Sequence, residues 1–521
     1  MNFINISKEN SYKENTISKT NIEVATLNNN KTFYSIYNPQ RDIDFFCSNE
    51  KIKNSGYICI AGIGNGYHIK QLSETYPDKF ILAFEINQTS LDFLLNSNDF
   101  SFCENKNILL TTLDNLKTKI IETYTPSIYE NFYFTNVKPW MDYHQEYFKI
   151  IEHQINSAIS IISSDFSVQS HFGKVWMHNI LENTNFLLKN KNHNKITIDN
   201  SKTAVVIGAG PSLDDSINFL KENKEKLFII STDTSYPSLL KNNIIPQVVV
   251  SIDAQIYSRE HFIGINNEIS KDTIFLLDIC ANSSIVKKLP NDNILFFTNG
   301  HPLANYIEDK SNSKFLRLNS GRGTVTSVAC DFATKCNFEN IILLGTDFSF
   351  YKNKPYTKST YLEKQFLYQS NKTKNLESQY TNLMLRTEIF RNKEGNFTTK
   401  LLDEYKEYQE KMIELSKSKF YIIDENCNPM KLSKFNGNFE ITKSSIENIS
   451  LSNPYIKNDI FNLLFTELSD LNEKNKNVKI YPILPLLAWG KNKKIDFFST
   501  INIAKKLIHN YTIRCYEFKS N

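Results

Sequence analysis

Short apolar runs alternate with amphipathic segments through the middle of the chain. Most of these runs are apolar at every position, which is typical of strands in a sheet that is covered on both faces. The segments between them have the period of a helix. This alternation predicts an α/β fold with a doubly wound, mostly parallel, Rossmann-like sheet. The predicted strands are residues 204–207, 227–231, 248–252, 274–277, 294–298, 315–318, 341–344 and 421–423, and the clearest helices are residues 323–336 and 399–418.

A shorter alternation of the same kind lies nearer the N-terminus and predicts a smaller Rossmann-like sheet with strands at 57–61, 80–86, 108–110 and 132–134. We expect a loosely packed lead-in before it and a polar linker at 189–200. An apolar run near the C-terminus, at 480–489, must be buried. The pattern divides the chain into an N-terminal Rossmann-like domain (1–142), a central domain (143–440, with a helical lead-in at 143–200 and a sheet at 201–440) and a mainly helical C-terminal domain (441–521).

The first strand of the central sheet runs into a glycine-rich turn with the sequence AVVIGAGPSLD, residues 204–214. Gly208 and Gly210 allow a tight turn without a Cβ in the way, Pro211 suits the first turn of a helix and Ser212 is a preferred capping residue. A helix that starts in this way directs backbone N–H groups at whatever lies above the sheet, which indicates a phosphate site. The alternative is a tight turn that holds no ligand.

Polar and small residues follow nearly every predicted strand of the central sheet. Ligands on such sheets bind at the carboxyl ends of the strands, so these residues predict a nucleotide or sugar site along one edge. The residues concerned are Gly208, Ala209, Gly210, Pro211 and Ser212, then Asp233, Asp253, Asn299, Ser320, Gly321, Thr324 and Asp347.

Three carboxylates in this set, Asp233, Asp253 and Asp347, have two interpretations. They could hold a divalent cation beside a diphosphate, or they could bind ribose, base or sugar hydroxyls without a metal. None of them belongs to a DxD pair, which favours the second interpretation, and we expect no metal and no cofactor.

The N-terminal sheet carries a glycine turn of its own. Gly62, Gly64 and Gly66 follow its first strand, and Glu85 ends the second at about the spacing expected for an acidic residue on a ribose hydroxyl. No residues for methyl or hydride transfer follow, so we expect a Rossmann-like half that keeps the turn and holds no cofactor.

Composition narrows the function classes. The chain has 60 basic and 56 acidic residues, and this near balance argues against a dedicated nucleic-acid surface. No apolar stretch is long enough to span a membrane, and the start shows no signal peptide. The eight cysteines form no CxxC pair, so zinc motifs are absent and a cytoplasmic protein with reduced thiols is expected.

The segment at 350–397 is rich in Tyr, Lys and Asn and has little periodicity. It is interpreted either as a mobile lid over the site or as a long surface insertion.

The order of these motifs resembles the central domain of the motility accessory factor (Maf) family. The motifs are SDFSVQSHFGKVWMHNILENT, AVVIGAGPSLD, the Asp233 turn, PQVVVSIDAQ, the Ser320-Gly321 helix and NIILLGTDFSF. The resemblance implies a glycosyltransferase that moves a nonulosonic acid, such as pseudaminic or legionaminic acid, from its CMP-activated form to Ser or Thr of flagellin during flagellar assembly. Flagellin and the CMP-sugar are the implied partners.

The same motif order is similar to a family of Rossmann-like bacterial sialyltransferases. That similarity implies that residues 208–212, with Ser320 and Gly321, hold the CMP, and that Asp233 and Asp253 stand where those enzymes carry Asn. The sialyltransferase general base, a His, has no counterpart here. Transfer to a hydroxyl needs a group that accepts its proton, and the candidates are Asp233, Asp347, Tyr356 and Glu388.

Two other functions stay open. An archaeal hydroxymethylpterin diphosphokinase shares the GAGPSLD domain, and such an enzyme would need ATP and Mg²⁺. A flagellin-binding accessory protein without catalytic activity would explain the missing His.

Overall fold

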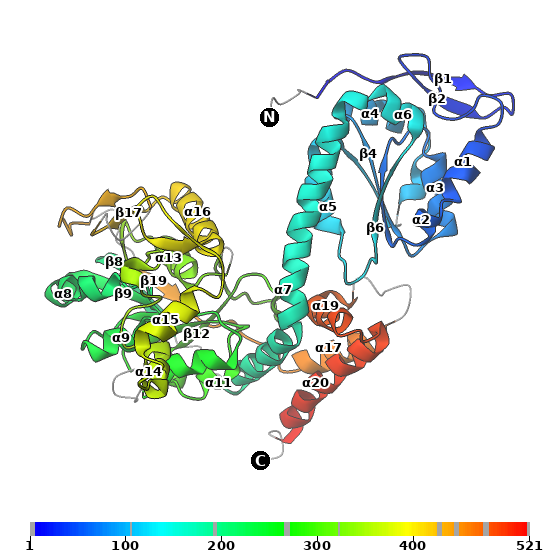
Figure 1. Cartoon of the computed structure of the whole chain (residues 1–521). Coiled ribbons are helices and arrows are strands. Elements are labelled where there is room, and N and C mark those ends of the chain that lie inside the picture. Colours follow the sequence, from blue (N-terminus) through cyan, green and yellow to red (C-terminus); the bar gives the residue numbers. More distant parts are fainter. Residues whose placement is uncertain are drawn as a thin grey trace. The chain divides into compact units, whose positions relative to one another are not determined.

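The computed structural model of the chain describes residues 6–104, 107–190, 195–264, 271–320, 323–424, 430–441, 448–471 and 479–517. It divides into two compact units (Figure 1). Unit 1 comprises Met1–Gly173 and Leu484–Thr500, and unit 2 comprises Lys174–Ile483 and Ile501–Asn521. Two helices, α7 (Phe148–Lys189) and α20 (Phe497–Glu517), run from one unit into the other. The division therefore falls inside helices and differs from the three predicted sequence ranges.

Unit 2 is built on a parallel sheet. Among the described residues it has nine strands in the order β13-β12-β11-β10-β9-β8-β14-β17-β18. The chain starts at β8, proceeds outward to β13, and then returns to place β14 beside β8, which confirms the predicted doubly wound topology. The strands are β8 (Thr203–Ile207), β9 (Leu227–Thr232), β10 (Val248–Ser251), β11 (Ile274–Asp278), β12 (Ile294–Thr298), β13 (Leu316–Arg317), β14 (Asn340–Leu344), β17 (Lys419–Ile422) and β18 (Ser433–Lys434).

Both faces of this sheet are covered, because successive residues of each strand point to opposite sides. Val206 of β8 belongs to an apolar cluster that includes Val328 and Phe332 of α13 (Val325–Lys335). Its neighbour Val205 belongs to the cluster on the other face, with Leu213 of α8 (Leu213–Asn223). The remaining helices are α9 (Tyr236–Lys241), η5 (Ile256–Phe262), α11 (Ser283–Val286), α12 (Pro302–Ser311), α14 (Tyr361–Gln369), α15 (Leu376–Met384), α16 (Lys400–Glu414), α17 (Ile460–Ser469) and η9 (Tyr481–Ile483).

Two further strand pairs of unit 2 were not predicted. The predicted linker at 189–200 contains β7 (Ile196–Asp199), which pairs antiparallel with β19 (Asn448–Leu451) of the otherwise helical C-terminal region. The predicted lid segment contains α14, α15 and β15 (Ile389–Arg391), and β15 pairs with β16 (Phe397–Thr399). A short strand whose partner lies about 250 residues away in sequence leaves no local periodic signal, and for that reason the linker interpretation of β7 was wrong.

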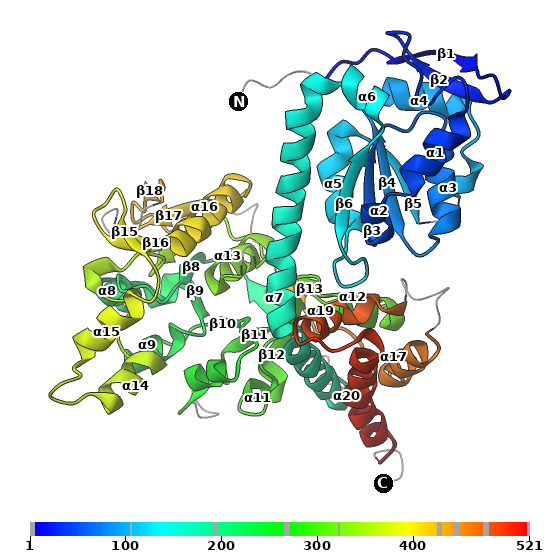
Figure 2. The same ribbon diagram turned by 45° about the vertical axis from the view of Figure 1, so that its right-hand side comes forward.

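Unit 1 contains the smaller sheet. Its parallel strands lie in the order β5-β4-β3-β6, with bounds Ile108–Thr112, Phe80–Glu85, Tyr57–Ala61 and Phe132–Asn136. Figures 1 and 2 show α1 and α3 on one side of this sheet and α5 on the other. The helices of this unit are α1 (Pro39–Cys47), α2 (Glu50–Lys53), α3 (Tyr67–Thr75), α4 (Gln88–Ser97), α5 (Leu116–Thr123), α6 (Lys138–Tyr143), the first part of α7, α19 (Leu484–Asn492) and the start of α20.

The N-terminal residues are better ordered than their sequence suggests. β1 (Tyr12–Ile17) and β2 (Glu23–Leu27) form an antiparallel hairpin. Tyr12, Val24, Ala25 and Leu27 are buried in the core of unit 1. The prediction of a loosely packed lead-in was therefore wrong from Tyr12 on. The hairpin is ordered because its apolar side chains pack into the core of unit 1, and its partners there are distant in sequence.

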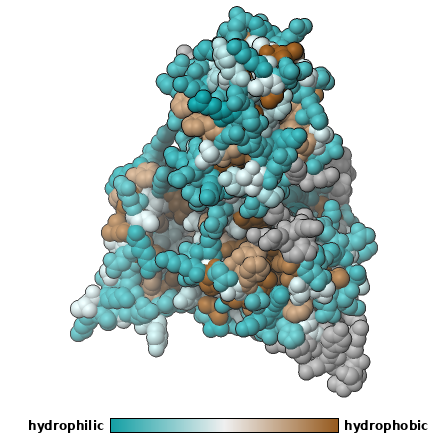
Figure 3. Space-filling model, turned by 90° about the vertical axis from the view of Figure 1, so that its right-hand side faces the viewer, coloured by the Kyte–Doolittle hydropathy of each residue, from teal (hydrophilic) through white to brown (hydrophobic). Residues whose placement is uncertain are grey.

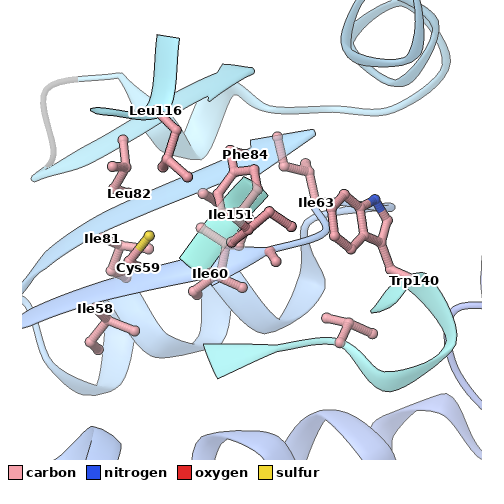
Figure 4. Packing of buried hydrophobic residues seen from close by; sticks show 14 of the residues in the cluster. Ile58, Cys59, Ile60, Ile63, Ile81, Leu82, Phe84, Leu116, Trp140 and Ile151 are labelled. Atoms are coloured by element: carbon pink, nitrogen blue, oxygen red, sulfur yellow. The ribbon is translucent and has the colours of Figure 1, made fainter. Parts of the chain in front are cut away.

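Aliphatic strand residues and a few aromatic side chains fill the core of unit 1 (Figure 4). Ile58, Ile60 and Leu82 come from the central strands, and Ile151 comes from α7. Trp140 is fully buried and meets Phe84 edge to face, with ring centroids 5.8 Å apart. The apolar run at 480–489 is also largely buried, as its composition predicted.

Glu85, the predicted ribose-binding residue, lies inside this core with no exposed surface. Its Oε1 accepts hydrogen bonds from the Ile63 N–H and the Tyr12 hydroxyl, and its Oε2 accepts one from the Trp140 indole N–H, each at 2.7 Å. A Cβ at Gly62 or Gly64 would lie within 2.9 Å of the Phe33 ring. Protein side chains thus fill the space above the turn and satisfy Glu85, although burial raises the pKa of this carboxyl.

Most of the surface in the view of Figure 3 is hydrophilic, with smaller hydrophobic patches between the polar residues. Among the described residues, no helix combines the length and the apolar character needed to cross a bilayer.

The Glu85 cluster gives a graded prediction for the stability of unit 1. Glu85→Ala leaves three buried donors without an acceptor, and at about 1–3 kcal/mol for each the free energy of unfolding should fall by at least about 3 kcal/mol. Glu85→Gln keeps the oxygen that serves Ile63 and Tyr12 but turns an NH2 donor toward the Trp140 N–H, so its loss should be smaller than that of Glu85→Ala. Urea unfolding followed by tryptophan fluorescence measures both. Glu74→Ala, on the exposed face of α3, is the control, and equal losses for the Ala and Gln variants would contradict the assignment.

Candidate functional site

Strands before β14 are added on one side of β8, and β14 and the strands after it lie on the other side, so the topological switch point of the large sheet lies between β8 and β14. Gly208 follows β8 and Gly345 follows β14, and the two turns pack backbone to backbone. A Cβ on Gly208 would collide with the Gly345 carbonyl oxygen, and one on Gly345 would lie 2.5 Å from the Gly208 oxygen. Gly345 also has a φ of +62°, which favours glycine. In an open α/β sheet this crevice is where ligands bind.

Most backbone donors of the predicted phosphate turn are already used within the protein. The Gly208 N–H donates to Leu344 O and the Gly210 N–H to Gly345 O, both at 2.8 Å. The Ser212 N–H donates to Asp347 Oδ2 at 2.9 Å, and Pro211 has no N–H. The predicted phosphate contact at this turn therefore rests on Ala209, whose N–H has no acceptor among the described residues. A carboxylate occupies the start of α8 in the place foreseen for a phosphate.

The carboxylate that lies in the place expected for a phosphate belongs to Asp347. Its side chain is 2% exposed, and its Oδ1 accepts a hydrogen bond from the Ser212 hydroxyl. Burial raises the pKa of Asp347 to about 7, against the lowering effect of the two hydrogen bonds from Ser212. Near neutral pH the group is thus divided between its protonated and ionised forms, which suits a group that exchanges a proton.

A cavity of about 510 Å³ opens beside Asp347. Its lining brings together five of the predicted site residues, Ala209, Gly210, Thr324, Asp347 and Tyr356. The volume lies in the range of small-molecule sites. Partial burial raises the pKa of the Tyr356 hydroxyl. The structure thus brings residues that follow β8, β13 and β14 together at one cavity.

The start of α13 forms another wall of the cavity, through Gly323, Thr324, Val325 and Thr326. Thr324 caps this helix, and its hydroxyl oxygen accepts the Ser327 N–H at 3.1 Å. The N–H groups of Val325 and Thr326 belong to the first turn, where no residue within the helix can accept them. At α8 the Ser212 N–H donates to Asp347, and the first three N–H groups of the helix donate to the carbonyls of Gly210, Pro211 and Ser212. The helix N-terminus at which an anion can bind in this cavity is therefore that of α13.

The predicted lid segment supplies a third wall with Phe350, Pro355, Tyr356 and residues 383–387. Within it, the Thr357 N–H donates to Ala209 O at 2.9 Å, and the Thr357 hydroxyl donates to Asp214 Oδ1 at 2.6 Å. The segment is therefore fixed to the glycine turn and to the start of α8. A closing movement of this segment stays a prediction.

Asp233 lies beside the cavity, between the lining residues Thr232 and Thr234. Its side chain is buried and accepts hydrogen bonds from the Ser251 hydroxyl at 2.6 Å and from the Thr234 N–H at 2.7 Å. These contacts tie the end of β9 to the end of β10. The geometry gives Asp233 a positioning role in the sheet edge.

Asp253, the third predicted carboxylate, is half-buried next to this pair. Burial and the neighbouring Asp233 raise its pKa, while its bond from the Gln255 N–H and the nearby His261 lower it. Buried amides fix the loop: the Asn179 side chain of α7 donates to Ala254 O at 3.1 Å, and the Asn282 N–H donates to Asp253 O at 3.0 Å. The HNILENT part of the sequence motif, through Asn179, thus holds the loop that follows β10 in place at this edge of the sheet.

The other predicted site residues lie elsewhere. The Asn299 side chain donates to the Ser320 hydroxyl at 3.3 Å, and neither lines the cavity. Glu388 is exposed. Gly321 lies outside the described residues.

Three comparisons with known proteins place this geometry in context. A family profile described as 6-hydroxymethylpterin diphosphokinase MptE-like matches residues 176–353. The structure of a MAf glycosyltransferase from Magnetospirillum magneticum AMB-1 superposes with a TM-score of 0.52 at 12% identity, covering 98% of this chain and 89% of that one. This chain has the fold of a Maf glycosyltransferase. The resemblance seen in the motif order is thereby confirmed at the level of the fold.

Three uncharacterised proteins of Treponema pallidum (strain Nichols) are similar to parts of this Maf-like chain. The first is 33% identical over 142 residues, 27% of this chain and 66% of the relative. The second is 40% identical over 136 residues (25% and 48%), and the third is 27% identical over 229 residues (43% and 39%). The matches thus span no more than 66% of the length of these relatives.

Sequence reasoning missed several residues along this edge of the sheet and in the cavity. Asp278, which ends β11, is buried, and burial raises its pKa to about 6. It follows a strand, so the rule that found the other carboxylates applies to it too. Arg386 and Tyr405 line the cavity from segments without a recognised motif, and only the tertiary structure brings them there.

The pKa of Asp347 gives a prediction about stability. Between about pH 4 and pH 7 the folded protein holds a proton on Asp347 that the unfolded chain has lost, so its free energy of unfolding falls as the pH rises, by at most about 1.4 kcal/mol per pH unit. Asp347→Asn imitates the protonated carboxyl and should lack the part of this decline that Asp347 contributes, while other buried carboxyls such as Asp278 keep theirs. Denaturant unfolding from pH 4 to pH 8 compares the two proteins. Asp309→Asn, on an exposed position of α12, controls for the loss of one carboxylate, and parallel stability curves for wild type and Asp347→Asn would show that the carboxyl titrates elsewhere.

Proposed function

We propose that this protein is a glycosyltransferase that uses a nucleotide-activated sugar. The observation that carries the proposal is the cavity at the β8–β14 crevice, which joins the first turn of α13, the hydroxyl groups of Thr232, Thr234 and Tyr356, and the titratable Asp347. The helix start suits a phosphate, the hydroxyls suit ribose or sugar groups, and Asp347 suits proton exchange. The fold shared with a Maf glycosyltransferase supports the same class.

In finer detail, we propose that the donor is a CMP-activated nonulosonic acid. The support is the motif order shared with the Maf family and with sialyltransferases that use CMP-sugars. We further propose Ser and Thr of flagellin as the acceptor and a role in flagellar assembly. The N–H groups of Val325 and Thr326 bind the single phosphate, and Ala209 and Gly210 form the opposite wall.

The transfer forms one bond and breaks one. The acceptor hydroxyl oxygen attacks the anomeric carbon, the bond from that carbon to the phosphate oxygen breaks, and CMP leaves. The hydroxyl proton passes to the ionised form of Asp347, whose negative charge also stabilises the positive charge that develops on the sugar. Tyr356 lies in the same cavity and is the second candidate for a contact with the acceptor.

A charge placed at the start of α13 tests the nucleotide site without weakening the fold. Thr326→Glu adds a carboxylate in the first turn, where the helix dipole stabilises it by about 0.3–1 kcal/mol, and the same charge repels a phosphate. We expect the affinity for CMP, measured by calorimetry, to fall at least about tenfold while thermal stability is kept. Thr326→Gln, of equal size and without charge, should bind CMP nearly as well as wild type. Unchanged CMP binding by Thr326→Glu would place the nucleotide elsewhere.

The reaction is tested by mass spectrometry of flagellin from cells with and without this protein, followed by transfer with purified donor and acceptor. We expect a sugar mass on Ser or Thr that needs the protein. Transfer should survive EDTA, because a monophosphate leaving group needs less charge neutralisation than a diphosphate. Asp347→Asn should lower turnover by about 10²–10⁴-fold with CMP affinity kept. A flagellin of equal mass in both cell types would contradict the proposal.

The match to the MptE-like profile favours one alternative, a diphosphokinase. Such an enzyme transfers a diphosphate from ATP and depends on Mg²⁺. ATP binding in preference to CMP, with activity that EDTA abolishes and Mg²⁺ restores, would support it.

A further inference from the structure

The charged side chains that line the cavity are few. Among the described lining residues they are Asp347 and Arg386. Asp347 is buried and held by Ser212, at the β8–β14 crevice. Among the described lining residues, Arg386 is therefore the positively charged one, and it lies in the wall that also contains Leu383, Met384 and Thr387.

Arg386 has no partner of its own. Among the described residues, no carboxylate lies within 4 Å of its guanidinium and no acceptor bonds to it, so its five N–H donors are directed to solvent or to a ligand. Arg391, five residues further along, is different: its side chain donates to Gly395 O at 2.7 Å and lies over the Phe397 ring, 4.5 Å from the centroid. The contrast indicates that Arg386 is available to a ligand and that Arg391 has a structural role.

Two places in the cavity carry positive potential, and a ligand that fits both should carry two negatively charged groups. The start of α13 accepts one anionic group, and Arg386 accepts a second. A guanidinium binds a carboxylate through two parallel hydrogen bonds in a fixed plane, which the point charge of a lysine does not reproduce. A sphere with the volume of this cavity is about 10 Å across, so the two groups must belong to neighbouring parts of one ligand.

In an activated ketosidic acid sugar, the carboxylate and the phosphate oxygen are bonded to the same carbon. We propose that Arg386 binds the sugar carboxylate of the donor and thereby selects acid sugars over neutral ones. This inference rests on the proposed glycosyltransferase function and deepens it, because it assigns a specificity-determining residue outside the motifs of the nucleotide site. A second phosphate, as in a nucleoside diphosphate, is the competing source of negative charge, and the experiment separates the two.

The test compares CMP, CDP and CMP-N-acetylneuraminic acid in calorimetry with wild type, Arg386→Gln, Arg386→Lys and the control Arg391→Gln. We expect wild type to bind the acid-sugar nucleotide more tightly than CMP. Arg386→Gln should weaken binding of the acid-sugar nucleotide by about 10–100-fold and leave the CMP affinity within about twofold. Arg386→Lys should restore part of the loss, and Arg391→Gln should resemble wild type for all three ligands.

Four results would overturn the proposal. The first is equal binding of CMP and the acid-sugar nucleotide by wild type, and the second is no loss of acid-sugar binding in Arg386→Gln. The third is an equal loss for CMP, which would make Arg386 a ligand of the first phosphate. The fourth is a loss for CDP as large as the loss for the acid sugar, which would assign Arg386 to a second phosphate. Failure of wild type to bind any of the three would instead contradict the proposed function itself, and with it this inference.

Discussion

The contact between the turns that follow β8 and β14 is the constraint on which the site depends. Gly208 and Gly345 approach so closely that neither can carry a side chain, and their N–H and C=O groups complete the hydrogen bonding at the end of the sheet. This contact brings Asp347 to the start of α8. Three walls of the cavity are positioned from this point: the glycine turn directly, the 350–397 segment through its bond to Ala209, and α13 through its packing on β8.

Asp347 changes what a familiar motif does. A strand, a glycine turn and a helix start are the usual elements of a phosphate site, yet here Asp347 binds Ser212 and the carbonyls of the turn itself accept the first N–H groups of α8. The positive potential available to a ligand then comes from α13 and from Arg386, on different walls of the cavity. Asp347, which binds the entry to α8, is buried and has a pKa near neutrality, and it is therefore available for proton exchange in the cavity beside it.

Both Rossmann-like sheets of the chain contain a strand followed by a glycine turn, with an acidic residue at the sheet edge, but the surroundings of the turn differ between the two. In unit 1, Glu85 at the end of β4 accepts three hydrogen bonds from Tyr12, Ile63 and Trp140, and aromatic rings cover the glycine turn. In unit 2, the corresponding edge of the sheet opens into a cavity. The pattern of glycines and an acidic residue therefore predicts the backbone geometry of the turn. The residues packed above the turn decide whether a ligand can reach it.

The sequence by itself determined the two parallel sheets, all of their strands except β18, the doubly wound topology, and the set of polar residues at the sheet edge. These follow from local apolar runs and from the fact that parallel strands end on one side. It could not determine that Asp347 binds Ser212 at the entry to α8, that Glu85 is enclosed, that β7 pairs with β19, or that Arg386 lines the cavity. Each of these depends on two segments that are distant in sequence and meet only in the folded chain, and a hydrogen bond or an enclosed charge is decided by what meets it there.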